Sequence, residues 1–384
     1  MERDSLDIII ETLGTLGGDG VSALEIADTV VEHMQTLYPK IEKGQYTAET
    51  IFRRLAKAVS LEESSTLHKM CVVICKDIDK LSGKELPYHN KQHFIEAMIN
   101  CFILGRTNGL DDDIIAKLLC AGLAHDFGYP GKNGTLVPNE KYGGRNTASS
   151  VEHYSCDQLR KCILAEEGEV FDEQELGEVE NLLELISALI ATTDFWASET
   201  KRMIEAVEQG KEFESTNTFL QDTFKYFHKL SETDQENFKS MMHVLLLADI
   251  FSSCVLGKDL SGEKNERYLN GELERGLPKS KIYASHLGFL GMVRKQGHFQ
   301  KDGIGYCFRE QFDSTMTELM DARKKEEYRE YARGIEERAR KASRISGGVK
   351  VSRHLKGPIP ILLCNAAEMR RVFPYPIPAQ ILAF

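Results

Sequence analysis

The chain has 384 residues, of which 42% are hydrophobic and 28% are charged, and its formal net charge is -11. This length and composition predict a globular protein with a large buried core. The acidic balance argues against nucleic-acid polymers as partners, because phosphate backbones need clustered Lys and Arg. A small anionic substrate is still compatible, because a bound cation can outweigh the local charge of the protein.

The cysteines and the first residues of the chain predict a cytoplasmic protein. The nine cysteines are odd in number and form no disulfide framework, as expected of free thiols in a reducing compartment. The start of the chain, MERDSLDIII, is acidic and lacks the layout of a signal peptide. No apolar run approaches the roughly 18 residues of a membrane span, so we expect no span.

Helical periodicity dominates the chain and predicts an all-α fold. Ser22 followed by Glu25 is a capping-box pattern at the start of an amphipathic stretch. No series of alternating strands with hairpin turns is visible. The expected helices cover residues 21–37, 48–59, 66–81, 113–124, 177–191, 238–256 and 312–341.

Loops and composition suggest a division of the chain into three parts. Gly and Pro mark expected loops at residues 127–146 and 257–265. The tail 346–384 is apolar and Pro-rich, so it cannot be helical throughout, and it either wraps over the body or binds a partner. We expect an N-terminal helical segment, residues 1–60, packed on or leading into a central domain, residues 61–345, followed by this tail.

The segment YHNKQH, residues 88–93, places two histidines one helical turn apart. His89 and His93 share one helical face at this spacing, so that one can bind a metal while the other points at a reacting group. The alternative is a pair of surface or capping histidines.

Two further segments place polar side chains in apolar helices. His125 and Asp126 end one apolar stretch, and Asp249 is the single carboxylate of another. Burying such groups is costly unless a partner satisfies them, and a divalent cation does so. An adjacent His and Asp can supply one nitrogen and one bridging carboxylate to a two-metal site. For Asp249 the alternative partner is a neighbouring helix terminus, and His243, on another face, is interpreted as structural.

These motifs, taken in order, resemble those of the class I cyclic-nucleotide phosphodiesterases, an HD-type family. Residues 88–93 resemble its YHNxxH motif, His125-Asp126 the start of its HDxxHxG signature, and Ala248-Asp249 its later Ala-Asp step. Residues 286–289, His-Leu-Gly-Phe, stand where the family carries Gln-x-Gly-Phe. The resemblance spans roughly residues 64–323.

The resemblance implies a compact multi-helix catalytic domain that binds two divalent metals. Zinc would occupy the first position, and magnesium or manganese the second, to which Asp126 would bridge. A metal-bridged hydroxide would attack the phosphorus of a 3′,5′-cyclic nucleotide, cAMP or cGMP, and His89 would protonate the leaving ribose oxygen to give the 5′-monophosphate. A homodimer is compatible with this assignment. The implied ligands of the first metal are His93, His125, Asp126 and Asp249, and the implied substrate-binding residues are Tyr88, His286 and Phe289.

Several positions depart from the family pattern. Tyr129 replaces the second histidine of the signature, Gly128 replaces the acidic residue before it, and His286 replaces the purine-clamping glutamine. These changes predict an altered second-metal shell and altered base recognition. They leave two alternatives open, namely another HD-type phosphohydrolase, such as a nucleotidase, and a non-catalytic protein that binds a nucleotide or a partner.

Overall fold

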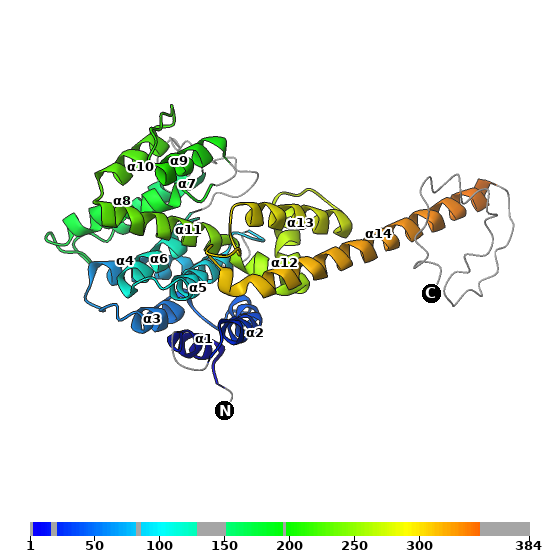
Figure 1. The fold of residues 1–384 in the computed structure, drawn as a ribbon, viewed down its shortest axis with the longest axis horizontal. Helices are drawn as coiled ribbons and strands as arrows, with labels where there is room; N and C mark the ends of the chain where they lie inside the picture. Colours follow the sequence, from blue (N-terminus) through cyan, green and yellow to red (C-terminus); the bar gives the residue numbers. More distant parts are fainter. Residues whose placement is uncertain (1–2, 17–20, 82–85, 129–150, 195–196, 346–384) are drawn as a thin grey trace. The chain divides into compact units, whose positions relative to one another are not determined.

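Helices account for the fold wherever the computed structural model describes the chain, which is over residues 3–16, 21–81, 86–128, 151–194 and 197–345 (Figure 1). No β-strand occurs within those ranges, where an isolated bridge joins Glu167 to Phe171. The predicted all-α fold is therefore confirmed.

The chain divides into two compact units, Met1–Glu327 and Tyr328–Phe384. Each helix predicted from periodicity is confirmed, with ends that shift by a few residues. In chain order the elements are α1 (Ser5–Gly14), α2 (Ala23–Glu42), α3 (Ala48–Ala58), α4 (Thr66–Asp79), α5 (Lys91–Thr107), α6 (Asp112–Ala124), α7 (Val151–Leu164), α8 (Leu176–Ile190), α9 (Ser198–Gln209), α10 (Thr218–Lys229), α11 (Glu232–Val255), α12 (Gly257–Glu266), the π-helical η2 (Arg267–Glu272), α13 (Lys279–Lys295), the 3-10 turn η3 (Tyr306–Phe308) and α14 (Arg309–Ile345).

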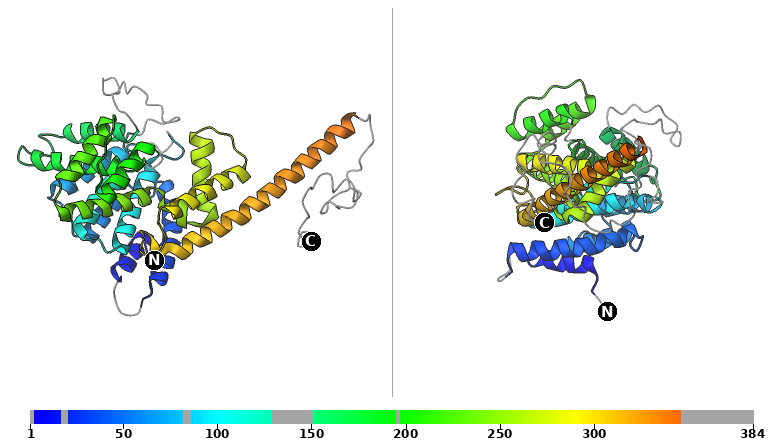
Figure 2. Two further views of the ribbon diagram at one scale, coloured as in Figure 1. Left: turned by 45° about the horizontal axis from the view of Figure 1, so that its top comes forward. Right: turned by 90° about the vertical axis from the view of Figure 1, so that its right-hand side faces the viewer.

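The N-terminal helices are held by polar caps and by packing on the rest of the first unit. Ser22 Oγ accepts a hydrogen bond from the Glu25 backbone N–H at 3.1 Å, and the Glu25 carboxylate accepts one from the Ser22 N–H at 2.9 Å. The predicted capping box is thus confirmed. Helices α1 and α2 lie side by side (Figure 2), and α2 also packs against α5. The division at residues 60 and 345 stays a prediction.

Helices α5, α6 and α11 pack against one another at the centre of the first unit. Side chains of α5 are buried without interruption from His93 to Gly105. A helix that is apolar on nearly every face is stable only when neighbours surround it, so this burial places α5 inside the unit. Polar side chains at this junction, such as those of His93, Asn100 and His125, are consequently kept away from water.

Helix α11 is long and apolar enough to cross a membrane by length and composition alone. Most of its apolar stretch is buried inside the fold, which is the situation of the core helix of a globular protein. This burial accounts for its apolar character without a bilayer.

The loop predicted at residues 257–265 is wrong, because α12 occupies Gly257–Glu266. Gly262, one of the glycines of the predicted loop, is buried inside this helix. A Cβ atom there would lie 3.0 Å from Cε1 of Tyr283 in α13. The glycine therefore serves close packing between two helices, a requirement that its sequence context does not reveal.

Two predicted segments lie mainly or wholly outside the described residues. Only Phe127 and Gly128 of the predicted loop 127–146 are described, and the tail 346–384 is not. The roles predicted for Tyr129 and for the tail therefore stay predictions.

Candidate metal centre

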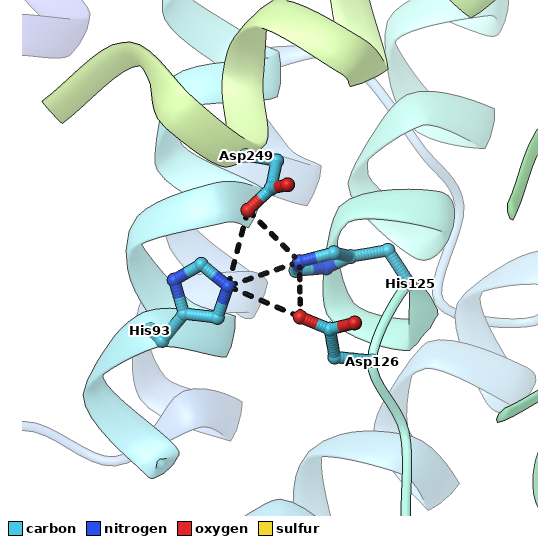
Figure 3. Close-up of side chains that lie close together, drawn as sticks. All are labelled: His93, His125, Asp126 and Asp249. Atoms are coloured by element: carbon cyan, nitrogen blue, oxygen red, sulfur yellow. Dashed lines mark hydrogen bonds and ion pairs between the residues drawn. The ribbon is translucent and has the colours of Figure 1, made fainter. Parts of the chain in front are cut away.

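Four of the predicted ligand side chains converge where α5, α6 and α11 meet (Figure 3). His93 lies in the first turn of α5, His125 and Asp126 follow the end of α6, and Asp249 lies in α11. One ligand atom from each residue falls within 4.8 Å of every other. The structure thus brings together residues that the sequence places in three separate segments.

Local hydrogen bonds aim the two histidines at this point. The Asn90 side chain caps α5 by accepting from the backbone N–H groups of Gln92 at 2.9 Å and His93 at 3.3 Å. This cap fixes where α5 begins and hence where His93 stands. Nδ1 of His125 lies 2.9 Å from the carbonyl oxygen of Gly122. Because a carbonyl only accepts, Nδ1 carries a proton and Nε2 faces the cluster, where a metal would take the place of any proton that Nε2 holds.

The separations between the ligand atoms fit a bound cation. Nε2 of His93 lies 3.1 Å from Nε2 of His125, 3.3 Å from Oδ2 of Asp126 and 3.2 Å from Oδ1 of Asp249. Nε2 of His125 lies 3.0 Å from Asp126 Oδ2 and 3.4 Å from Asp249 Oδ1. Metal bonds of about 2.0–2.2 Å place neighbouring ligand atoms about 3 Å apart. The donor set, two imidazoles and two carboxylates, therefore suits a divalent metal.

The electrostatics of the cluster favour positive charge at its centre. Burial acts to raise the pKa of Asp126, but the charges of His125 and His89 outweigh it and hold that pKa well below its usual range. Asp249 shows the same balance, with hydrogen bonds from His125 and His93 lowering its pKa. Burial opposes charge on His125, whereas Asp126 raises its pKa well above the usual value. Both carboxylates thus stay anionic and attract either protons or a cation.

His89 lies at the edge of the cluster and is held there by Glu272. Nε2 of His89 is 3.5 Å from Asp126 Oδ2, and its Nδ1 is 2.5 Å from Oε1 of Glu272. The other oxygen of Glu272 accepts the backbone N–H groups of Tyr88 at 3.3 Å and His89 at 3.2 Å. Because a carboxylate accepts, His89 donates from Nδ1 and turns Nε2 towards the cluster.

Glu272 is a functional candidate that sequence reasoning missed. It ends the π-helical turn η2, and only 4% of its surface is exposed. Burial acts to raise its pKa, but the hydrogen bond from His89 outweighs burial and lowers that pKa, so the carboxylate stays charged. π-helical turns are frequent at functional sites, but they are recognised from backbone hydrogen bonds, so this signal was not available in the sequence.

The predicted substrate-binding residues occupy different surroundings. The ring of Tyr88 lies 4.7 Å from that of His93 and 4.9 Å from that of His89, measured between centroids. His286 is 1% exposed, and its Nε2 donates to the carbonyl of Ser253 at 2.9 Å. Burial lowers the pKa of His286 to about 4, so that its ring is neutral. The Phe289 ring, partly buried, lies 6.2 Å from the ring of His286. Their roles towards a substrate stay predictions.

The backbone at position 128, where the family signature has an acidic residue, explains why this chain has a glycine there. Its φ is 73°, in the left-handed region, and a Cβ there would lie 2.8 Å from Cγ of Gln158. A side chain here would therefore be strained, and the Gln158 side chain would have to shift to make room for it.

An all-α fold with a buried His–Asp cluster at the junction of three core helices defines a helical protein with an HD-type centre. Residues 88–256 match the family model described as 3′5′-cyclic nucleotide phosphodiesterase. The matched segment contains His89 and the four cluster residues, whereas Glu272, His286 and Phe289 lie beyond it.

Parts of the chain also resemble individual proteins in sequence or in fold. The chain is 31% identical over 122 residues to the cGMP-specific 3′,5′-cyclic phosphodiesterase gamma of Plasmodium yoelii, a match that covers 30% of this chain and only 16% of that protein. The phosphodiesterase domain of Salpingoeca rosetta rhodopsin phosphodiesterase has the same fold, with a TM-score of 0.51 and 17% identity over 75% of this chain and 90% of that one. The phosphodiesterase domain of the RhoPDE fusion protein from the same choanoflagellate gives a TM-score of 0.49, 18% identity and coverage of 74% and 92%.

Proposed function

We propose that the protein hydrolyses a 3′,5′-cyclic nucleotide, cAMP or cGMP, to its 5′-monophosphate with the help of bound divalent metals. The observation that carries this proposal is the cluster of His93, His125, Asp126 and Asp249 with His89 at its edge. All five residues fall inside the segment that matches the cyclic-nucleotide phosphodiesterase family. The cGMP-specific relative supports a cyclic nucleotide as the substrate class.

The donor set supports zinc at the first position and magnesium or manganese at the second. Two imidazole nitrogens with two carboxylate oxygens suit zinc, whereas a position held mainly by one carboxylate and water suits magnesium or manganese. Such cations supply an activated water and neutralise charge that develops on the phosphoryl oxygens. Asp126 is the residue proposed to serve both positions.

His89 is proposed as the general acid. Hydrolysis forms a bond between water oxygen and phosphorus and breaks the bond from phosphorus to the ribose 3′ oxygen, which must gain a proton. With Nδ1 bonded to Glu272, His89 presents Nε2–H on the side of the cluster. The anionic Glu272 stabilises the charged imidazolium, and transfer of the Nε2 proton to the leaving oxygen leaves a neutral ring.

The test is a product assay with cAMP and cGMP in Mg²⁺, Mn²⁺ and Zn²⁺. We expect the 5′-monophosphate as product and no free phosphate from the wild type. Asp249→Ala should lose turnover because it removes a ligand. His243→Ala is a matched control in the same helix, since His243 pairs with Glu208 at 3.0 Å outside the cluster. Turnover equal to that of Asp249→Ala would refute the proposal, and free phosphate as product would indicate a nucleotidase.

A further inference from the structure

A buried chain of hydrogen bonds connects helix α2 with two helices that carry the cluster. The hydroxyl of Tyr38 in α2 donates to Oδ1 of Asn100 in α5 at 2.7 Å. Nδ2 of Asn100 donates to the carbonyl of Ala248 at 2.7 Å and to Oγ of Ser252 at 3.2 Å, both in α11. Tyr38 and Asn100 are each 1% exposed. Because water does not reach this site, a group that loses its hydrogen-bond partner stays unsatisfied, and the loss of one bond weakens the next bond in the chain.

The roles of these groups follow from their chemistry. A carbonyl only accepts, so the NH₂ group of Asn100 faces Ala248 and its oxygen must face α2. Tyr38 therefore donates to that oxygen. Burial and the nearby charge of Glu96 raise the pKa of Tyr38 well above its usual value, which keeps the hydroxyl protonated. The chain of bonds thus has one direction, from Tyr38 through Asn100 to Ala248.

This chain ends beside two of the cluster residues. Asn100 follows His93 by seven residues in α5, so the two side chains lie on nearly the same helical face. Ala248 immediately precedes Asp249 in α11. The bond from Asn100 to Ala248 therefore resists sliding of α5 along α11. Such sliding would change the 3.2 Å separation between His93 Nε2 and Asp249 Oδ1.

A second contact brings Tyr38 close to the helix that leads to Glu272. Lys264 in α12 pairs with Glu96 in α5, with only 13% and 2% of these side chains exposed. Nζ of Lys264 lies 5.8 Å from the centroid of the Tyr38 ring, within cation–π range. Tyr38, in α2, therefore lies close to residues of both α5 and α12. Helix α12 continues into η2, which carries Glu272.

We propose that Tyr38 is a positioning residue for the metal centre. Through Asn100 it holds α5 and α11 in the register that brings His93 and Asp249 together. The inference rests on the metal-dependent function proposed above. Tyr38 lies outside the segment that matches the family, residues 88–256, so metal affinity would depend on a helix that the family match does not include.

Tyr38→Phe tests this inference because it keeps the ring over Lys264 and removes the donor to Asn100. Tyr46→Phe is the matched control, since the Tyr46 hydroxyl, between α2 and α3, donates at 2.7 Å to Oδ2 of Asp4, the N-cap of α1. Mn²⁺ is titrated into the metal-depleted full chain without nucleotide. We expect the Kd for Mn²⁺ to rise about three- to tenfold in Tyr38→Phe and to stay within about twofold in Tyr46→Phe.

Asn100→Ala separates positioning from a general loss of stability. If Tyr38 acts through Asn100, adding Tyr38→Phe to Asn100→Ala should not raise the Kd any further. An unchanged Kd in Tyr38→Phe, independent effects that add in the double variant, or a wild type that binds no Mn²⁺ would each overturn the inference. A chain that binds Mn²⁺ but hydrolyses no cyclic nucleotide would refute only the proposed function, because the titration contains no nucleotide.

Discussion

The Glu272 carboxylate lies 2.5 Å from Nδ1 of His89 and also accepts the His89 backbone N–H at 3.2 Å. One side chain therefore fixes both the ring and the main chain of the proposed general acid. Glu272 ends η2, which directly follows α12, and it lies 183 residues further along the chain than His89. The carboxylate supplies negative charge on the side of the ring that faces away from the cluster.

Glu272→Gln should slow the chemical step more than it weakens substrate binding. The amide can still accept from Nδ1, but it is neutral and no longer stabilises a protonated His89. We expect kcat to fall about 10- to 100-fold with little change in KM. Steady-state kinetics at saturating metal would measure both constants.

Glu274→Gln is the matched control, because Glu274 is exposed two residues further along the chain. It should retain nearly full kcat. A Glu272→Gln enzyme with wild-type kcat would show that His89 needs no charged partner.

Removal of metal should lower the thermal stability of the wild type but not that of Asp249→Asn. A cation that binds only the folded state adds stability by mass action, about 2.7 kcal/mol at a hundred times its Kd. The variant lacks one anionic ligand, so the metal-induced rise in Tm should disappear. Its metal-free form should be less stable than the metal-free wild type, because the Asp249 carboxylate, whose pKa the hydrogen bonds from His125 and His93 lower, stabilises the fold as an anion. Thermal melts with chelator and with added Mn²⁺ give both comparisons, and an undiminished metal-induced rise in Asp249→Asn would exclude Asp249 as a ligand.

His125, Asp126 and Asp249 were predictable because each lies in or at the end of an apolar helix, where burial without a partner is costly. His93 was predicted from its one-turn spacing to His89 and from the resemblance of its segment to the family motif. Glu272 was not predictable in this way. Its surroundings, RYLNGELERG, are polar, and a glutamate is ordinary there. Its burial arises from a tertiary contact with His89, 183 residues earlier in the chain. Sequence periodicity reports which face of a helix is buried, but it does not report which distant segment covers that face.

The glycines show the same limit in the fold. Gly262 suggested a loop, whereas its missing side chain makes room for Tyr283 inside a helix pair. The apolar residues of α11 made it recognisable as a helix. The contact of Asn100 with Ala248, however, depends on the register in which α5 packs against α11. Periodicity therefore predicted the positions of α2, α3, α4, α6, α8, α11 and α14. It did not predict the other helices, which include α5 at the centre of the site, or the contacts between helices.

Metal affinity should rise with pH through the neutral range. The carboxylates raise the pKa values of His93 and His125 despite burial, so the metal-free site holds protons at neutral pH that a metal must displace. The stability that these protonated rings add to the metal-free fold is complete below the unfolded pKa of about 6.5 and is lost as pH rises through the folded values. Each displaced proton should strengthen binding up to about tenfold per pH unit. Mn²⁺ titrations at pH 6.5 and 8.0 would measure this change, and an affinity independent of pH would contradict it.

His286 should make the protein sensitive to acid. Burial lowers its pKa to about 4, whereas the unfolded chain has a value of about 6.5. Between these values the unfolded state binds a proton that the folded state does not, so stability falls as pH drops from 6.5 towards 4. At pH 5 the loss from this residue is roughly 2 kcal/mol, at 1.36 kcal/mol for each pH unit below 6.5.

His286→Gln should reduce that loss, because an amide can still donate to the Ser253 carbonyl and does not titrate. Urea unfolding of the metal-depleted protein at pH 7 and pH 5 measures the difference for each variant. The exposed His228 provides the control, and His228→Gln should retain the wild-type difference. If His286→Gln loses as much stability at pH 5 as the wild type does, the buried imidazole is not a source of the acid sensitivity. The drop would then have to come from other groups, of which His298, whose pKa burial also lowers to about 4, is the first to substitute.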